Sequence, residues 1–169
     1  MKILNGAIAA AIISTFAASA QAQDSDAYVN VGVQTYEFDT YNIVGRVGYN
    51  FSEYFGVEGE GSVGVIGEEE DFFGETIEFD TKYSLGGYLV ARYPASDQFS
   101  VFVRAGYTTV NVEISGGGES EDENFDGFAI GGGLQYNFDA QNGVRLGYTY
   151  NDGDGIEADV IDLTYVRNF

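Results

Sequence analysis

The chain has 169 residues, with 27 acidic against 7 basic residues, and it contains no Cys, His or Trp. Without His and Cys, it cannot form a Ser-His-Asp triad, a cysteine nucleophile, a disulfide framework or a zinc site with the usual ligands. The formal net charge of −20 argues against a nucleic-acid partner, which requires clustered Lys and Arg. Hydrophobic residues make up 44% of the chain, so it has enough apolar surface to fold as an ordered domain.

The first 22 residues have the organisation of a secretory signal peptide. Lys2 provides a positive start, residues 3–16 are almost entirely apolar or small, and small residues then continue to Ala22. An apolar stretch of about fourteen residues is too short to cross a hydrocarbon core of about 30 Å as a helix. We therefore expect a signal peptide over residues 1–22, cleaved after Ala22 or alternatively after Ala20, and a single domain over residues 23–169.

From residue 27 onward, hydrophobic and polar residues alternate in stretches of about ten, with polar or Gly-rich turns between them. The stretches that predict β-strands cover residues 27–35, 41–51, 55–65, 83–93, 99–108, 128–138, 144–150 and 161–169. Strands joined in sequence by hairpins close most naturally into a barrel, because closure removes both edges of the sheet. The predicted fold is all-β, an eight-stranded antiparallel up-and-down barrel.

Two kinds of barrel fit this outline. A soluble lipocalin-like barrel turns its apolar face inward, whereas an outer-membrane barrel turns it toward lipid. The connections favour the second kind, because those at residues 52–54, 94–97 and 140–142 are short, while those at residues 68–80 and 115–126 are long and acidic. Short turns at one rim and long loops at the other are typical of outer-membrane barrels, so the predicted barrel is transmembrane.

Aromatic residues near both ends of the predicted strands support the same choice, since aromatic girdles suit the headgroup level of a membrane. The group expected at the short-turn rim is Tyr49, Phe51, Phe55, Tyr93, Phe99, Tyr136, Phe138 and Phe169. The group expected at the other rim is Tyr41, Tyr83, Tyr107, Phe128, Tyr148 and Tyr150.

The eight alternating stretches, the Gly-rich segment 128–138, the segment 103–107 and the terminal Phe169 together resemble the small outer-membrane β-barrel family of Gram-negative bacteria, of the porin-like or opacity-protein type. The resemblance implies a location in the outer membrane, with both ends of the barrel chain on the periplasmic side. It also implies that the last strand is read by the barrel-assembly machinery. The residues that match this assembly signal are Phe169, Tyr165, Leu163 and Ile161. Arg167 departs from it, at a position where an aromatic or apolar residue is usual.

Charged residues on the polar face of the strands should lie inside the barrel, where eight strands leave just enough room for side chains. Unpaired charges there are costly, so the arginines need partners. The expected ion-pair network consists of Arg46, Glu58, Glu60, Arg92, Arg104 and Arg145, and Arg46 with Glu60 is the first candidate pair. Such a network acts either as a structural plug or as a gate in a narrow channel.

The acidic residues outside the strands gather in loops at one rim, and include residues 68–71, 119–123 and 152–154. They form either a solvated, self-repelling surface or a site for divalent cations that bridge to lipopolysaccharide. The segment Asn151-Asp152-Gly153-Asp154-Gly155 resembles the start of a calcium loop, but it lacks the full ligand pattern, so no metal or cofactor residues are assigned.

Enzymatic barrels of this size rely on a catalytic His, which this chain lacks, so we expect no catalytic activity. The sequence favours a structural or surface-interaction protein with acidic extracellular loops. The alternatives are a small passive diffusion channel and, less favoured, a soluble periplasmic lipocalin-like binder. The expected partners are outer-membrane lipid, lipopolysaccharide and, during biogenesis, the assembly machinery, with the protein itself a monomer.

Overall fold

The computed structural model describes residues 26–36, 40–66, 68–72, 75–116, 119–153 and 156–169. The predicted signal peptide, residues 1–22, with both of its cleavage positions, lies outside this part of the chain. The strands are β1 (Ala27–Tyr36), β2 (Thr40–Asn50), β3 (Phe55–Ile66), β4 (Glu68–Phe72), β5 (Glu75–Pro94), β6 (Phe99–Gly116), β7 (Glu119–Asn137), β8 (Asn142–Gly153) and β9 (Ile156–Asn168). Among the described residues, no helix is long and apolar enough to cross a membrane.

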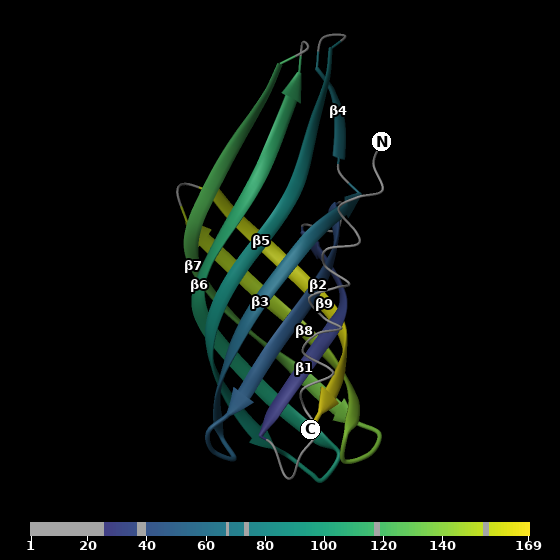
Figure 1. Ribbon diagram of the computed structural model, residues 1–169, viewed down its shortest axis with the longest axis vertical. Helices are drawn as coiled ribbons and strands as arrows, with labels where there is room; N and C mark the ends of the chain where they lie inside the picture. The colour runs from purple at the N-terminus through teal and green to yellow at the C-terminus, as the bar shows by residue number, and fades with distance from the viewer. Residues whose placement is uncertain (1–25, 37–39, 67, 73–74, 117–118, 154–155) are drawn as a thin grey trace.

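The strands close into a barrel (Figure 1). The 9-stranded sheet has the order β3-β2-β1-β9-β8-β7-β6-β5-β4, and an additional pairing of β3 with β5 closes the ring. The strand β4, at the end of this order, continues the sheet beyond the ring along the upper part of β5, which leaves the other eight strands in the barrel wall. The predicted eight-stranded antiparallel barrel is confirmed.

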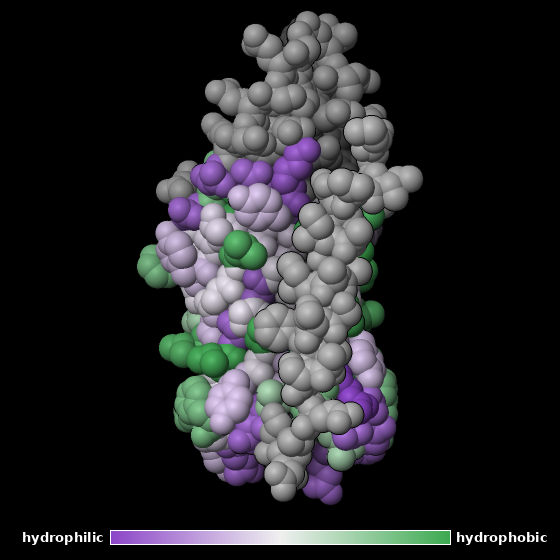
Figure 2. Space-filling model, viewed as in Figure 1, coloured by the Kyte–Doolittle hydropathy of each residue, from purple (hydrophilic) through white to green (hydrophobic). Residues whose placement is uncertain are grey.

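The alternation of the sequence divides the side chains between an apolar outer wall and a polar interior. Leu89 is 67% exposed on the outer wall, while Arg46 and Asp162 in the interior are 3% and 2% exposed. A water-soluble barrel would have the opposite arrangement, so the lipocalin-like alternative is wrong for this fold. Figure 2 shows the hydrophobic residues on the wall between more hydrophilic zones toward its ends.

Large aromatic side chains lie on the outer wall near both rims, as their spacing in the sequence predicts. Those near the short-turn rim include Tyr49, Phe51, Phe55, Tyr93 and Phe138, all more than half exposed. Near the other rim, Phe128 is 75% exposed and its ring meets the ring of Tyr107 edge to face, with centroids 5.4 Å apart. These positions suit a membrane interface, where the aromatic ring meets both hydrocarbon and headgroups.

At the lower end of Figure 1, three connections of four residues join β2 to β3, β5 to β6 and β7 to β8. Each contains a short side chain that accepts backbone N–H groups. Ser52 Oγ accepts from Phe55 N at 3.0 Å, and Ser96 Oγ accepts from Phe99 N at 3.1 Å. Asp139 Oδ1 accepts from Asn142 N at 2.8 Å. Side chains that replace missing backbone partners are what make such tight turns stable.

At the opposite rim, the structure corrects one prediction. The acidic segments expected as loops at residues 68–80 and 115–126 are largely strand, so that β5, β6 and β7 are 20, 18 and 19 residues long. The β6–β7 pairing continues to Gly116 opposite Glu119. Strands outside a membrane need only a hydrogen-bonded partner, and charged side chains are tolerated on solvated strands. We call the β4–β5 and β6–β7 extensions the long hairpins.

Candidate functional site

The lumen contains an ion-pair network of three arginines and three carboxylates, Arg46, Arg104, Arg145, Glu58, Glu60 and Asp162. Arg46 Nε lies 2.6 Å from Glu60 Oε2, and Arg46 Nη1 lies 2.7 Å from Asp162 Oδ1. Arg104 Nη1 also lies 2.6 Å from Glu60 Oε2, so one carboxylate oxygen accepts from two guanidinium groups. Arg145 pairs with Glu58. Because the formal charges cancel, the network as a whole is neutral.

The strand register explains how these groups meet. Arg46 of β2 lies directly opposite Glu60 of β3, so this pair forms between neighbouring strands. The other pairs join strands that are not neighbours in the sheet. Arg46 of β2 pairs with Asp162 of β9, while Arg104 of β6 and Arg145 of β8 pair with carboxylates on β3. The network therefore ties opposite walls of the barrel together across the lumen.

Aromatic rings surround the guanidinium groups. The Cζ of Arg104 lies 4.2 Å from the ring centroid of Tyr88, and that of Arg145 lies 4.4 Å from the centroid of Phe102. The hydroxyl of Tyr28 donates to Glu58 Oε1 at 2.7 Å. An aromatic ring stacked on a guanidinium group stabilises the buried positive charge and also fills space in the lumen. Together with the network, they occupy much of the lumen cross-section.

Burial makes the pairing obligatory. The side chains of the network have relative exposures between 0% and 7%. A charge buried to this degree is stable only with a partner, because removing one member of a buried pair leaves an uncompensated charge. Two neighbouring groups complete the set: Thr149 Oγ1 accepts from Arg104 Nη2 at 2.7 Å, and Gln135 Oε1 accepts from Arg145 Nη2 at 3.0 Å.

Of the residues expected in the lumen network, the structure brings together Arg46, Glu58, Glu60, Arg104 and Arg145. It does not include Arg92, which lies near the short-turn rim, two residues from the end of β5, and has no ion pair with any residue in the described part of the chain. Its backbone N instead donates to Tyr54 O at 2.7 Å.

The sequence-based set lacked Asp162, which the structure places in the network as the second partner of Arg46. The signal was present, because Asp162 alternates with the apolar Ile161 and Leu163 and so belongs to the polar face. What the sequence does not contain is the distance across the lumen, since Arg46 and Asp162 are 116 positions apart.

Small residues make room for the network. A Cβ atom on Gly147 would lie 2.3 Å from Asp162 Oδ2, and a Cβ on Gly48 would lie 2.1 Å from the ring of Tyr28. Contacts below 3.0 Å are not tolerated without movement, and both of these neighbours are held by the network. Glycine is therefore the residue that these two lumen positions accept.

One side of the lumen holds buried polar atoms that lack a hydrogen-bond partner. These atoms are Gln34 Oε1, Asn42 Oδ1 and Nδ2, Thr164 Oγ1, Arg46 Nη2 and Glu58 Oε2. Asn42 lies directly opposite Gln34, and Gln34 lies directly opposite Asp162, so several of these groups share one wall. Such positions suit a few buried water molecules.

The residues expected as an assembly signal lie along β9 on the outer wall. Leu163 and Tyr165 are 55% and 43% exposed, Ile161 is partly exposed, and the N of the terminal Phe169 donates to Ala27 O at 3.1 Å. Arg167 lies beside the β7–β8 turn, where its Nη1 donates to Asn142 Oδ1 at 2.8 Å. A polar partner at the rim accommodates this charge, whose cost near a membrane interface is only about 0–1 kcal/mol.

The part of the chain that the structure describes contains no group of three or more acidic residues arranged to hold a metal ion. Asp154 and Gly155 of the calcium-loop-like segment are outside the described residues, and so are the side chains of residues 68–71 and 119–123. In the β8–β9 hairpin, Asp152 lies directly opposite Glu157, which places two like charges side by side.

Comparisons with solved structures support the architecture. The chain is similar to Ail, the attachment invasion locus protein of Yersinia pestis, with a TM-score of 0.64 and 19% identity over 87% of this chain and 100% of that chain. For the N-terminal β-barrel domain of Pseudomonas aeruginosa OprF, the TM-score is 0.68 and the identity 14%, over 87% and 100%. For Neisserial surface protein A, the TM-score is 0.57 and the identity 12%, over 85% of this chain and 94% of that chain. At these identities the similarity shows the fold alone.

Among curated protein sequences there is no significant match. A sequence model of the outer membrane protein beta-barrel domain, however, matches residues 8–169, which is nearly the whole chain. The closed antiparallel barrel, the apolar outer wall and the polar lumen agree with this match. The chain therefore belongs to the outer membrane protein beta-barrel family.

Proposed function

We propose that this outer-membrane barrel is a non-catalytic anchor whose lumen is closed and whose long hairpins interact with partners at the cell surface. The observation that carries the proposal is the neutral ion-pair network, with side-chain exposures of 0–7%, that joins opposite walls of the barrel. Next to it, the cavity lined by Tyr36, Glu60, Tyr88 and Arg104 has a volume of only ≈ 10 Å³. That volume is room for about one water molecule.

The same network supports the non-catalytic part of the proposal. A general acid or base needs a carboxyl group that can exchange a proton with a substrate. Glu58, Glu60 and Asp162 are each engaged by a guanidinium group and are nearly inaccessible. Pairing of this kind accounts for their presence in the lumen without a catalytic role.

The long hairpins are the part available to a partner. About 9–11 tilted residues suffice for a strand to cross a membrane. Since β5, β6 and β7 have 20, 18 and 19 residues, about nine residues of each strand, or roughly 30 Å, extend past the membrane. Their sequences include the unbroken acidic run Glu68–Asp71, which favours a partner with a basic surface. Ail, by contrast, has been solved with sucrose octasulfate, a heparin analogue and thus a polyanion.

The two ends of the barrel differ, and this difference gives the protein an orientation in the outer membrane. The short turns and the terminal Phe169 lie at the same end of the barrel (Figure 1), and we place this end in the periplasm and the long hairpins outside. It also includes lipopolysaccharide and outer-membrane lipid as surroundings, the assembly machinery during biogenesis, and a monomeric state. Protease added to intact cells should cleave within the long hairpins and spare the short turns; the reverse pattern contradicts the orientation.

A second candidate, a narrow passive channel, is favoured by the unpartnered polar atoms of Gln34, Asn42 and Thr164, which give one wall of the lumen groups that can hydrogen-bond to water. Planar-bilayer recording distinguishes the two. For a closed lumen, the wild-type protein should give no steady current steps above those of the same detergent without protein. Steady steps that change on Glu60→Gln substitution would contradict the anchor and favour the channel.

The surface-interaction part needs its own test. Barrels reconstituted in nanodiscs should bind a basic polypeptide such as polylysine and not heparin, and shortening both long hairpins should abolish this binding. Heat-modifiable migration on gels is the control for folding, because the shortened barrel retains the network. Unchanged polylysine binding after shortening would locate the acidic contact elsewhere on the protein.

A further inference from the structure

One edge of β7 is open above the rim of the barrel. The ladder between β6 and β7 runs without a register shift up to Gly116 opposite Glu119. On its other side, β7 pairs with β8 only from Phe128 onward, where Phe128 lies opposite Asp152. Figure 1 shows the β6–β7 hairpin rising past the ends of β8 and β9. In the described part of the chain, no strand pairs with that side of residues 119–126, which we call the β7 edge.

The β7 edge presents backbone groups that need a partner. Every second residue of an antiparallel strand directs its N–H and C=O away from the neighbour with which the strand already pairs. The eight residues of the edge span about 26 Å at about 3.3 Å each. Proteins usually blunt such an edge with Lys, Pro, a bulge or a covering segment. The β7 edge has neither Lys nor Pro, and its ladder with β6 has no bulge, so it is a template for an added strand.

The long hairpins have a second open edge, that of β4, which is a poorer template. The strand β4 has only 5 residues. Its neighbour β5 is irregular close by, because the ladder of β5 with β6 shifts register between Thr81 and Tyr83. A short edge strand and a bulge are two of the ways in which proteins keep an edge from pairing. The β7 edge is therefore the better place for a partner strand.

The charge of the β7 edge determines which kind of strand can be added. Its acidic residues are Glu119, Glu121, Asp122, Glu123 and Asp126. The chain contains no Lys or Arg between Arg104 and Arg145, so no basic residue of the adjoining sequence offsets them. Pairing of this edge with the same edge of a second copy would set like charges opposite one another, which is destabilising, whereas opposite charges in cross-strand pairs are stabilising. The edge therefore favours a basic strand over a second copy of the chain.

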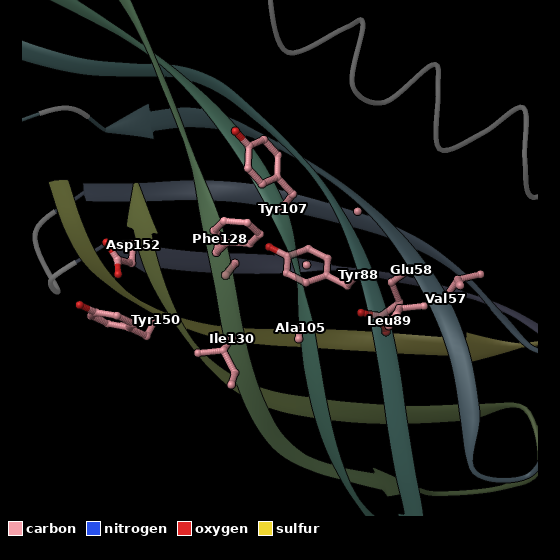
Figure 3. Close-up of a pocket in the computed structure, with 13 residues that line it drawn as sticks. Val57, Glu58, Tyr88, Leu89, Ala105, Tyr107, Phe128, Ile130, Tyr150 and Asp152 are labelled. Atoms are coloured by element: carbon pink, nitrogen blue, oxygen red, sulfur yellow. The ribbon is translucent and has the colours of Figure 1, made fainter. Parts of the chain in front are cut away.

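Exposed carboxylates continue the acidic surface below the β7 edge. Asp152 of β8 and Glu157 of β9 lie directly opposite each other, and both are exposed. Figure 3 shows the Asp152 carboxylate together with the Tyr150 ring, and Asp152 lies opposite Phe128 of β7 in the ladder. A strand added to the β7 edge would run in line with β8, so its lower end would reach these two carboxylates. They also favour a positively charged segment.

We propose that the β7 edge binds an extended, basic segment of a partner protein by strand addition. Main-chain hydrogen bonds to β7 supply the affinity, and Lys or Arg side chains of the partner supply the specificity. This inference rests on the proposed function, which assigns a basic partner to the long hairpins. It adds the place and the mode of binding, which are the backbone edge of one hairpin and not the acidic surface as a whole.

Two peptides of equal charge separate strand addition from attraction by charge. The strand-forming peptide is Lys-Thr-Lys-Thr-Thr-Lys-Thr-Lys, and in the control peptide the two central Thr are replaced by Pro, which removes a donor from each edge of the peptide. Fluorescence anisotropy of the labelled peptides measures their binding to the full protein in nanodiscs. We expect the strand-forming peptide to bind about tenfold more tightly than the control, a difference of about 1.4 kcal/mol.

Hydrogen exchange locates the contact on the wild-type protein and needs no variant. Binding of the strand-forming peptide should slow amide exchange within residues 119–126, because an added strand takes up the N–H groups of the β7 edge. Exchange within β4, residues 68–72, should stay unchanged. Slower exchange in β4 with none in the β7 edge would overturn the choice of edge.

Two shortened proteins remove equal charge from the two hairpins. One replaces residues 112–123 by the turn Asn-Gly and the other replaces residues 69–78 by the same turn, and in both the flanking residues are paired in the ladder. Each deletion removes five acidic residues. The first should abolish the preference for the strand-forming peptide and the second should retain it, whereas attraction by charge alone predicts equal effects. Heat-modifiable migration confirms that both barrels fold.

The outcomes separate this inference from the proposed function. Equal affinity of the wild-type protein for the two peptides, with polylysine still bound, overturns strand addition and leaves the basic partner in place. Absence of binding to polylysine and to both peptides overturns the proposed function, and this inference with it. A wild-type dimer that the strand-forming peptide dissociates overturns the choice of occupant in favour of a second copy of the chain.

Discussion

Removing Glu60 is the most informative perturbation of the lumen, because its Oε2 atom accepts from two arginines at 2.6 Å each. In Glu60→Ala, Arg46 retains Asp162 as a partner. Of its polar partners, Arg104 retains the hydroxyl of Thr149 and a distant contact of 3.8 Å with Glu58 Oε2. The variant therefore leaves one positive charge in excess, located mainly on Arg104.

The magnitude follows from the burial of Arg104, whose side chain is 2% exposed. Breaking a buried ion pair by removing one partner costs about 3–5 kcal/mol. Proteins of this size are stable by about 5–15 kcal/mol, so the barrel should lose about a fifth or more of its stability. Removing Arg104 as well restores neutrality, so the double variant Glu60→Ala/Arg104→Ala should be more stable than the sum of the single changes by about 1–3 kcal/mol.

The assay is equilibrium unfolding in urea with the barrel reconstituted in vesicles. Because the chain has no Trp, the folded fraction is best read from heat-modifiable migration or from circular dichroism. Glu60→Gln separates charge from shape, since the amide retains the size of the carboxylate. A loss below about 0.5 kcal/mol in both Glu60→Ala and Glu60→Gln, typical of a surface position, would refute the reasoning and indicate that water screens the network.

Three further predictions concern other parts of the barrel. Gly147→Ala should destabilise it by about 1–3 kcal/mol, because the added Cβ displaces the Asp162 carboxylate from Arg46; an unchanged urea midpoint would contradict this. Asn42→Leu should stabilise it by about 1–3 kcal/mol, since both unpartnered amide atoms disappear, and a lower midpoint would show that the amide is hydrogen-bonded to water. In the β7–β8 turn, hydrogen bonds from the Asn142 side chain hold the pKa of Asp139 below its ordinary value. The stability that the ionised Asp139 carboxylate adds through these hydrogen bonds is complete above a pH of about 4, and it disappears as the pH falls through the lower pKa of the folded state. The stability difference between wild type and Asp139→Asn should therefore shrink on acidification.

The barrel is predictable from the sequence because its wall follows one local rule. Alternation alone assigns Leu89 to lipid and Arg46 to the lumen, and it also identifies the strands and the short turns. The register of Arg46 opposite Glu60 follows from counting back through the turn between β2 and β3. The alternation along each strand and the register of a short hairpin both involve residues close together in the chain, so they can be inferred from the sequence.

The complete ion-pair network depends on distances across the barrel, and the structure of the long hairpins depends on the solvent outside the membrane. Counting along hairpins does not reveal that Arg145 reaches Glu58, 87 positions away, or that Asp162 completes the network. Arg92 has the same parity as the other lumen arginines, yet it lies too near the rim to join them. The long hairpins were predicted as loops because of their acidic residues, although the alternation of Val110, Val112 and Ile114 with polar residues continues the strand pattern.

The placement of Asp162 on the last strand has a consequence for the order of folding. The contacts of Arg46 with Asp162 and of Arg145 with Glu58 span 116 and 87 positions, so neither exists while the sheet is open. Until β9 pairs with β1, the remaining five members of the network carry one uncompensated positive charge. An open sheet would present that charge to hydrocarbon, where an Arg costs about 2–4 kcal/mol at the midplane. Closure by the C-terminal strand is thus the event that makes the interior neutral, and it must accompany insertion rather than follow it.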